Sequence, residues 1–138
     1  MKIIVIDGQG GKMGKGVVEQ LKKARPELEL IAVGTNSIAT SAMLKAGADA
    51  GATGENPVIV NSRDADIIIG PIGIVIANSL LGEITPAMAV AVGSSPAQKI
   101  LIPSSRCHQF VAGCRELPLG AYIREGVERV DELLGEKD

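Results

Sequence analysis

Hydrophobic residues in this chain fall into short aliphatic runs that alternate with amphipathic stretches. The first run, residues 3–6, has no polar break, which is typical of a strand buried on both faces. Apolar residues then recur at spacings of three and four from Met13 to Ala24, and this spacing predicts a helix with one apolar face. The helix should end before Pro26, which cannot continue it. A strand, a turn and a helix therefore open the chain.

The same pattern continues along the rest of the chain. Aliphatic runs predict further strands at residues 28–33, 58–60, 66–70 and 99–103, and a sixth short strand at 109–112. Periodic or alanine-rich stretches predict helices at residues 38–46, 86–92 and 119–134, and residues 74–81 are apolar on every side of a short helix. This alternation indicates an α/β fold, a single-domain, three-layer Rossmann-like fold over residues 1–138 with a mostly parallel sheet. We expect the strand order 3-2-1-4-5, with the last strand at an edge.

Composition limits the partners of such a domain. The 138 residues are 46% hydrophobic and carry a net charge of −2, with one Tyr, one Phe and no Trp. Neither a basic patch nor an aromatic platform for nucleic acid is therefore expected. The longest apolar stretch, residues 67–81, is broken by glycine, proline and polar residues, so the sequence predicts no membrane span. Two cysteines and the lack of a signal-peptide pattern indicate a cytoplasmic protein.

A glycine-rich turn joins the first strand to the first helix. It fits the form G-x-x-G-x-x-G through Gly8, Gly11 and Gly14. Glycines in such a turn let the backbone approach the phosphates of a dinucleotide, and the helix N-terminus offers free N–H groups and the positive end of its dipole. The alternative is a tight turn that needs glycine for backbone geometry alone. The expected cofactor-binding residues of this turn are Gly8, Gln9, Gly10, Gly11, Lys12, Met13 and Gly14.

The sequence of this turn, GQGGKMG, resembles the nucleotide loop of dihydrodipicolinate reductase and related NAD(P)-binding Rossmann proteins, which has the form G-x-G-G-x-M-G. The resemblance covers residues 1–35 and implies that NAD or NADP binds at the loop. The reductase's catalytic segment, paired histidines and a lysine ahead of Asp-Ala-Pro-Ser-Gly, has no counterpart here. As a whole, the chain resembles a family of short, uncharacterised bacterial proteins with a Rossmann-like fold.

Two further groups of residues are expected beside the glycine turn. In NAD-binding folds an acidic residue at the end of the second strand accepts the ribose hydroxyls. This chain offers Thr35, Asn36 and Ser37 there instead. They could bind a ribose or a 2′-phosphate, which leaves NAD and NADP open, or they could cap the next helix. A second glycine loop after the fourth strand should face the first where the strand order reverses, and it contains Gly70, Pro71 and Gly73.

Polar residues after the fifth strand form a third candidate group. A guanidinium beside two hydroxyls could receive a phosphate or carboxylate of a substrate, and these residues are Ser104, Ser105 and Arg106. The nearby Cys107, His108 and Cys114 do not match the spacing of a structural zinc site. No metal is therefore predicted, and the role of these three residues stays open.

Two functions from different classes fit this sequence. One is an NAD(P)- or other dinucleotide-binding protein of unknown physiological role, and the other is a small NAD(P)-dependent oxidoreductase. The Tyr-x-x-x-Lys pair of short-chain reductases is missing, since Tyr122 is followed by Glu125 and Gly126, and this favours binding without catalysis. A P-loop-like nucleotide hydrolase fits less well, because one residue too many separates Gly8 from Gly14 and no hydroxyl follows Lys15. Whether the protein is an enzyme is thus left open.

The segment from Ile72 to Val92 predicts self-association. Its apolar residues would cover all sides of a short helix, and one such helix buries only a single stripe against a sheet. A contiguous apolar patch on a small domain is more often an interaction site than an accident. We therefore expect a homo-oligomer, in its simplest form a twofold dimer that pairs this segment with itself. The alternative is that the segment is covered by its own chain.

Overall fold

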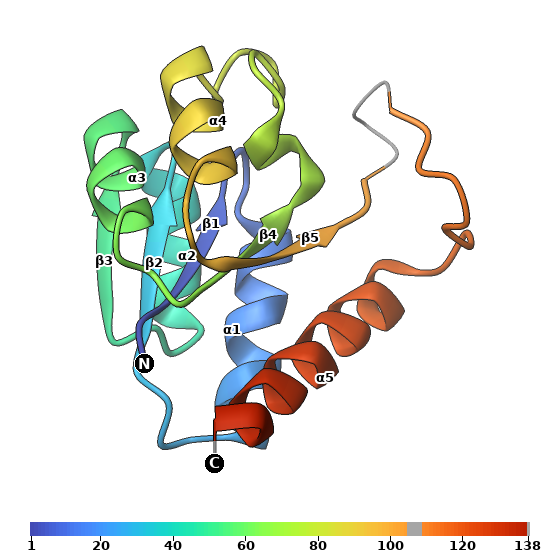
Figure 1. Ribbon diagram of the computed structural model, residues 1–138. Coiled ribbons are helices and arrows are strands. Elements are labelled where there is room, and N and C mark those ends of the chain that lie inside the picture. Colours follow the sequence, from blue (N-terminus) through green and yellow to red (C-terminus); the bar gives the residue numbers. More distant parts are fainter. Residues whose placement is uncertain (105–108, 138) are drawn as a thin grey trace.

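Five parallel strands form the centre of the protein (Figure 1). The computed structural model describes residues 1–104 and 109–137. Within them the strand order is β3-β2-β1-β4-β5, which confirms the expected order and places β5 at an edge. Ile3 of β1 is in register with Leu30 of β2 and with Ile67 of β4. The strands are β1 (Ile3–Asp7), β2 (Leu30–Gly34), β3 (Ala50–Thr53), β4 (Ile67–Pro71) and β5 (Gln98–Ile102).

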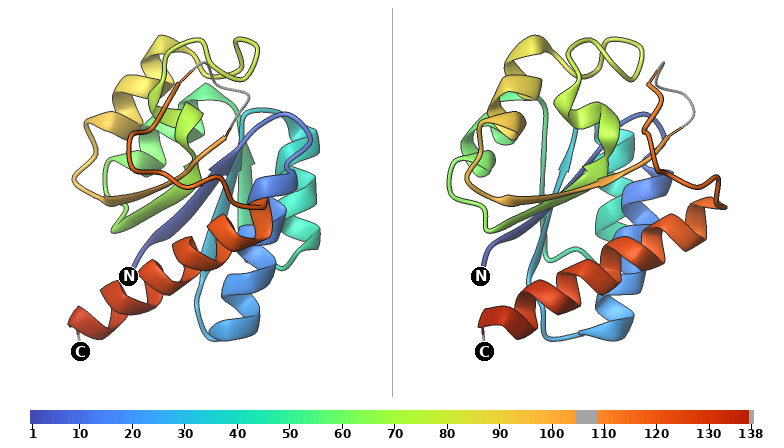
Figure 2. Two further views of the ribbon diagram at one scale, coloured as in Figure 1. Left: turned by 90° about the vertical axis from the view of Figure 1, so that its right-hand side faces the viewer. Right: turned by 45° about the vertical axis from the view of Figure 1, so that its right-hand side comes forward.

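Helices cover both faces of this sheet and give the three layers that the sequence predicts (Figure 2). One face carries α1 (Lys12–Ala24), α2 (Ser37–Lys45) and α5 (Leu119–Lys137). The other carries α3 (Glu55–Ser62), the 3-10 turn η1 (Ile72–Val75) and α4 (Pro86–Gly93). The described part of the chain is thus an α/β domain with a parallel sheet.

Successive side chains of β1 alternate between two separate hydrophobic cores. Ile3 and Val5 point into the core beneath α1, α2 and α5, whereas Ile4 and Ile6 point into the core beneath α3 and α4. All four are at most 1% exposed. This explains why the first aliphatic run has no polar break, since both faces of a central parallel strand are buried.

The region before β4 differs from the sequence prediction. Residues 58–60, expected as a strand, lie inside α3, where Val58 packs into the core. The true third strand, β3, has the sequence AGAT and is largely exposed at the free edge of the sheet. A strand of small residues carries no hydrophobic pattern. Its glycine serves close packing, because a Cβ on Gly51 would lie 3.0 Å from the Leu44 side chain of α2.

The apolar stretch after β4 is not the expected helix. It forms η1 and then a series of turns over residues 76–85, and these bury Ile74 and Ile84 completely in the chain's own core. α4 then begins as predicted, with the Thr85 hydroxyl accepting the Met88 N–H at 3.1 Å. Residues 109–112, expected as a short sixth strand, contain none. None of the helices described is long and apolar enough to cross a bilayer.

Candidate functional site

The glycine turn, residues 8–11, lies at the carboxyl edge of the sheet and is held by the aspartate that precedes it. The Asp7 carboxylate accepts the Gly8 N–H at 2.8 Å and the Gly14 N–H at 2.7 Å. Asp7 is only 6% exposed. Burial raises the pKa of this carboxyl above its usual value, although the N–H groups that it accepts oppose the increase. Two N–H groups of the predicted phosphate loop are therefore already paired within the chain.

Gly8 and Gly11 of this turn, and Gly14 in the first turn of α1, have a packing role. Gly11 has a φ of 74°, and a Cβ there would lie 2.7 Å from the Ala39 Cα of α2. A Cβ on Gly14 would collide with the Met43 side chain. Gly10 differs, because a Cβ there would have no neighbour within 4 Å. The open part of the loop, where a ligand has access to the backbone, is therefore at Gly10.

Glu83, from the turns between η1 and α4, reaches the same loop. Its Oε1 accepts hydrogen bonds from the Gln9 N–H at 2.9 Å, the Thr35 hydroxyl at 2.6 Å and the Asn36 side-chain amide at 2.7 Å. Partial burial acts to raise the pKa of Glu83, but the bonds from Thr35, Gln9 and Asn36 outweigh it and leave the pKa below its usual value. Three donors from two separate segments thus converge on one anionic oxygen.

Sequence reasoning missed Glu83. One indication was present, because Glu83 is the only charged residue between Ile67 and Gln98. A single carboxylate in so apolar a stretch needs partners wherever it is not fully solvated. The pattern could not name those partners, since 74 positions separate Glu83 from Gln9.

The polar residues after β2 include the helix cap that the sequence left open as an alternative, whereas their contact with a ribose or phosphate stays a prediction. Asn36 caps α2, because its Oδ1 accepts the Ala39 N–H at 2.9 Å. Its side-chain amide also donates to the Gln9 carbonyl at 3.0 Å, and so ties the end of β2 to the glycine turn. Thr35 faces Glu83, whereas Ser37 is exposed in the first turn of α2.

The second glycine loop lies at the same edge of the sheet but is buried beneath the turns that follow it. A Cβ on Gly70 would collide with the Ile6 carbonyl, so this glycine allows β4 to approach β1 closely. Pro71 and Gly73 are buried as well. Contact of these residues with a ligand stays a prediction.

Only part of the anion-binding group predicted after β5 lies within the described residues. Ser104 follows the strand, while Ser105, Arg106, Cys107 and His108 lie outside the described residues. Across 1–104 and 109–137, no group of three His, Cys, Asp or Glu side chains is placed to hold a metal ion.

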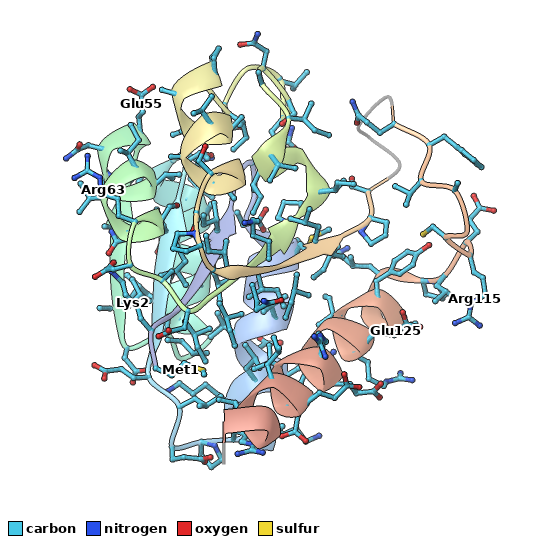
Figure 3. The ribbon with its side chains drawn as sticks, in the orientation of Figure 1. Met1, Lys2, Glu55, Arg63, Arg115 and Glu125 are labelled. Atoms are coloured by element: carbon cyan, nitrogen blue, oxygen red, sulfur yellow. The ribbon has the colours of Figure 1, made fainter. Side chains whose placement is uncertain are left out.

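Two hollows are not lined by residues 8–11, although the second includes Ser37, one of the predicted cofactor-binding residues. A cavity of about 380 Å³ lies between β5, residues 113–117 and α5. Its wall is fixed by the Tyr122 hydroxyl, which accepts the Leu117 N–H and donates to the Arg115 carbonyl. Figure 3 shows Arg115 beside Glu125 at this rim, where the two form an ion pair at 3.2 Å. A second, open groove of about 630 Å³ lies between α1 and α2, with Lys15 and Lys45 on its walls.

Comparisons with known proteins identify a family. The model of the family described as "Domain of unknown function (DUF3842)" matches residues 2–135. No functionally curated protein matches, and nothing in the comparisons supports the likeness of the turn to dihydrodipicolinate reductase. Among solved structures, the chain is similar to a dodecameric FMN-dependent Ubix-like decarboxylase from Escherichia coli O157:H7. That likeness has 19% identity and a TM-score of 0.44, over 95% of this chain and 77% of the other.

Proposed function

This chain belongs to the DUF3842 family, and from its own geometry we propose that it binds a nucleotide or dinucleotide, NAD or NADP, at the carboxyl edge of its sheet. On this proposal residues 1–138 act as one nucleotide-binding domain, and binding takes place without turnover. One observation carries the proposal. Gln9, Thr35 and Asn36 direct three donors at a single anionic oxygen beside the N-terminus of α1.

The position of these donors favours a phosphate ligand. They lie between β1 and β2, on the side of the sheet where ligands bind in doubly wound folds. The backbone at Gly10 is open beside them, and the exposed Lys12 adds a positive charge in the first turn of α1. A phosphate at this point would interact with the donors, the lysine and the helix dipole together.

Thermal-shift measurements with a panel of ligands test the proposal. The panel contains NAD, NADP, their reduced forms, FAD, FMN, ATP and coenzyme A. A ligand that binds only the folded state raises the melting temperature with concentration. We expect NAD or NADP to give the largest increase, and no increase from any member would contradict the proposal.

A substitution at Gly10 then tests whether the ligand binds at the glycine turn. Gly10→Val should leave the melting temperature of the free protein nearly unchanged, because the added side chain meets no neighbour, but it should block the approach of a phosphate. Gly93→Val is the matched control, since Gly93 has equally open surroundings at the far end of α4. Equal ligand shifts in the two variants would exclude the glycine turn as the site.

We also propose a homodimer through the segment from Ile72 to Val92. Most apolar side chains of this segment are buried in their own chain, and the proposal now rests on Leu81, 96% exposed, and Val90, 65% exposed. Light scattering at micromolar concentration should give twice the chain mass of 14.2 kDa. A mass near 14.2 kDa would contradict the dimer.

A further inference from the structure

The turns that carry Glu83, residues 76–85, are here called the strap; Figure 2 shows this yellow-green segment at the edge of the sheet where the strands end, and Glu83 connects it to the glycine turn. Their contact is close, because a Cβ placed on Gly8 would lie 2.9 Å from the Leu80 side chain and 3.1 Å from the Glu83 Oε1. The strap therefore covers the beginning of the loop and leaves Gly10 open.

The backbone of the strap is strained. Asn78, Leu80 and Leu81 have φ values of 65°, 55° and 55°. Asparagine tolerates this left-handed region, but a leucine there costs roughly 1–2 kcal/mol. Leu81 gains no packing in return, since it is 96% exposed. A conformation of this kind persists only where other contacts enforce it.

Several contacts hold the strap in place, among them a hydrogen bond from the Ser79 hydroxyl to the Gly73 carbonyl. Ile84 is fully buried in the core beneath α3 and α4. Glu83 supplies the polar contact with the glycine turn and the end of β2, through its three hydrogen bonds to Gln9, Thr35 and Asn36. Hydrogen bonds to a charged group are stronger than those between neutral groups, so the carboxylate is the strongest single link between the strap and the loop.

We propose that Glu83 is an internal substitute for the phosphate of the ligand, and that the ligand must displace it. This inference rests on the proposed function. The three donors around the Oε1 can hold one anionic oxygen, and a phosphate placed there would meet the carboxylate at contact distance with like charge. Entry of a phosphate therefore removes Glu83 from the donors and releases the strap from the glycine turn. In the ligand-free chain, Glu83 occupies the position of the phosphate and the strap covers the beginning of the glycine turn.

The test compares Glu83→Gln with a matched control, Glu29→Gln. The control changes an exposed glutamate immediately before β2, at the opposite edge of the sheet. Calorimetry uses NAD and inorganic pyrophosphate as probes. Loss of the competing charge should lower the Kd of both probes by about tenfold, equivalent to 1.4 kcal/mol. Glu83→Ala removes the acceptor entirely and should lower the Kd at least as far, while Glu29→Gln should leave it unchanged.

Hydrogen exchange of the ligand-free protein gives a second readout. The amide of Gln9 donates to Glu83, so its exchange should accelerate in Glu83→Gln and stay unchanged in Glu29→Gln. Pyrophosphate added to the wild type should accelerate exchange in residues 79–84.

The outcomes separate the inference from the proposed function. If the wild type binds NAD but Glu83→Gln binds it equally or more weakly, the displacement is wrong and the proposed function stands; weaker binding would make Glu83 a ligand contact. If neither probe binds any variant, the proposed function and the displacement both fail. If exchange at Gln9 is unchanged in Glu83→Gln, the carboxylate does not hold the loop and the inference is overturned.

Discussion

Two acidic residues meet the same glycine turn, and they differ in almost every physical respect. Asp7 is adjacent to the turn in sequence, is nearly inaccessible and binds Gly8 and Gly14. Glu83 comes from a distant and strained strap, is partly exposed and binds Gln9. Their pKa values shift in opposite directions, because burial dominates at Asp7 and hydrogen bonds dominate at Glu83.

This difference indicates that Asp7 has a structural role, and we expect a ligand to displace Glu83 rather than Asp7. Displacing Asp7 would leave two buried N–H groups without partners, which is costly. Displacing Glu83 allows its charge to reach water and relieves the leucines in the left-handed region. The turn therefore has one permanent anion beneath it and one replaceable anion beside it.

Removal of the buried carboxylate should have the largest effect. Asp7→Ala leaves the N–H groups of Gly8 and Gly14 unpaired, at roughly 1–3 kcal/mol for each. The free energy of unfolding, measured by urea denaturation, should fall by about 4 kcal/mol for the two groups together. Asp7→Asn keeps one acceptor oxygen and should lose less. A change below about 0.5 kcal/mol, the usual range for surface substitutions, would show that Asp7 does not hold the turn.

Substitution at Gly11 should cause the next largest loss in the free energy of unfolding. Valine there would place its Cβ against the Ala39 backbone and would adopt a φ of 74°. Left-handed backbone and overpacking together cost roughly 2–5 kcal/mol. From sequence alone, a bulky residue at Gly11 would be expected to abolish binding while the fold survives. Because of the contact with Ala39, we expect Gly11→Val also to weaken the packing of α2. The free energy of unfolding, measured by urea denaturation, should therefore be lower for Gly11→Val than for Gly10→Val. Equal stability of the two variants would contradict it.

Loss of the Glu83 charge should have a smaller effect, and one that depends on pH. The pKa of Glu83 is lower in the folded chain than its ordinary 4.5, so its contribution is complete above the unfolded pKa and is lost as the pH falls through the folded pKa. At pH 7, Glu83→Gln should lower the free energy of unfolding by about 1 kcal/mol. The two unfolding curves should converge in acid. A difference that is constant from pH 7 to pH 3 would contradict this assignment.

The smallest expected effect is a gain in stability. Leu81→Asn places a residue that tolerates the left-handed region at a φ of 55°, and it gives up no packing because Leu81 is exposed. The free energy of unfolding should rise by roughly 0.5–1 kcal/mol. If Leu81 lies in the proposed dimer interface, the same substitution should also weaken the dimer in light scattering. A loss of stability in the monomer would show that the strap is not strained at this position.

The sequence predicts those parts of the fold that depend on local pattern. Continuous aliphatic runs identified β1 and β4, and helical spacing identified α1 and α5. The strand order followed from the glycine turn and the alternation of elements. Of the polar residues after β2, Asn36 proved to be the cap of α2, which is one of the two roles expected from the sequence.

The parts that could not be predicted depend on distant contacts. β3 has no hydrophobic pattern because it consists of small residues. Its position in the sheet depends on the packing of Leu44 against Gly51. The apolar stretch after β4 looked like a helix exposed on all sides, whereas Ile74 and Ile84 enter the core through turns. The contact between Glu83 and Gln9 is of the same kind, since no periodicity links residues so far apart.

Backbone amide NMR tests the claim that the glycine turn receives a phosphate. NAD and pyrophosphate would be titrated separately into the ¹⁵N-labelled wild type and into Gly10→Val. In the wild type both ligands should shift the amide resonances of Gln9, Gly10 and Lys12 and those of the strap around Glu83, and these shifts should disappear in Gly10→Val. Shifts confined to the cavity between β5 and α5, or the same shifts in both proteins, would contradict the claim.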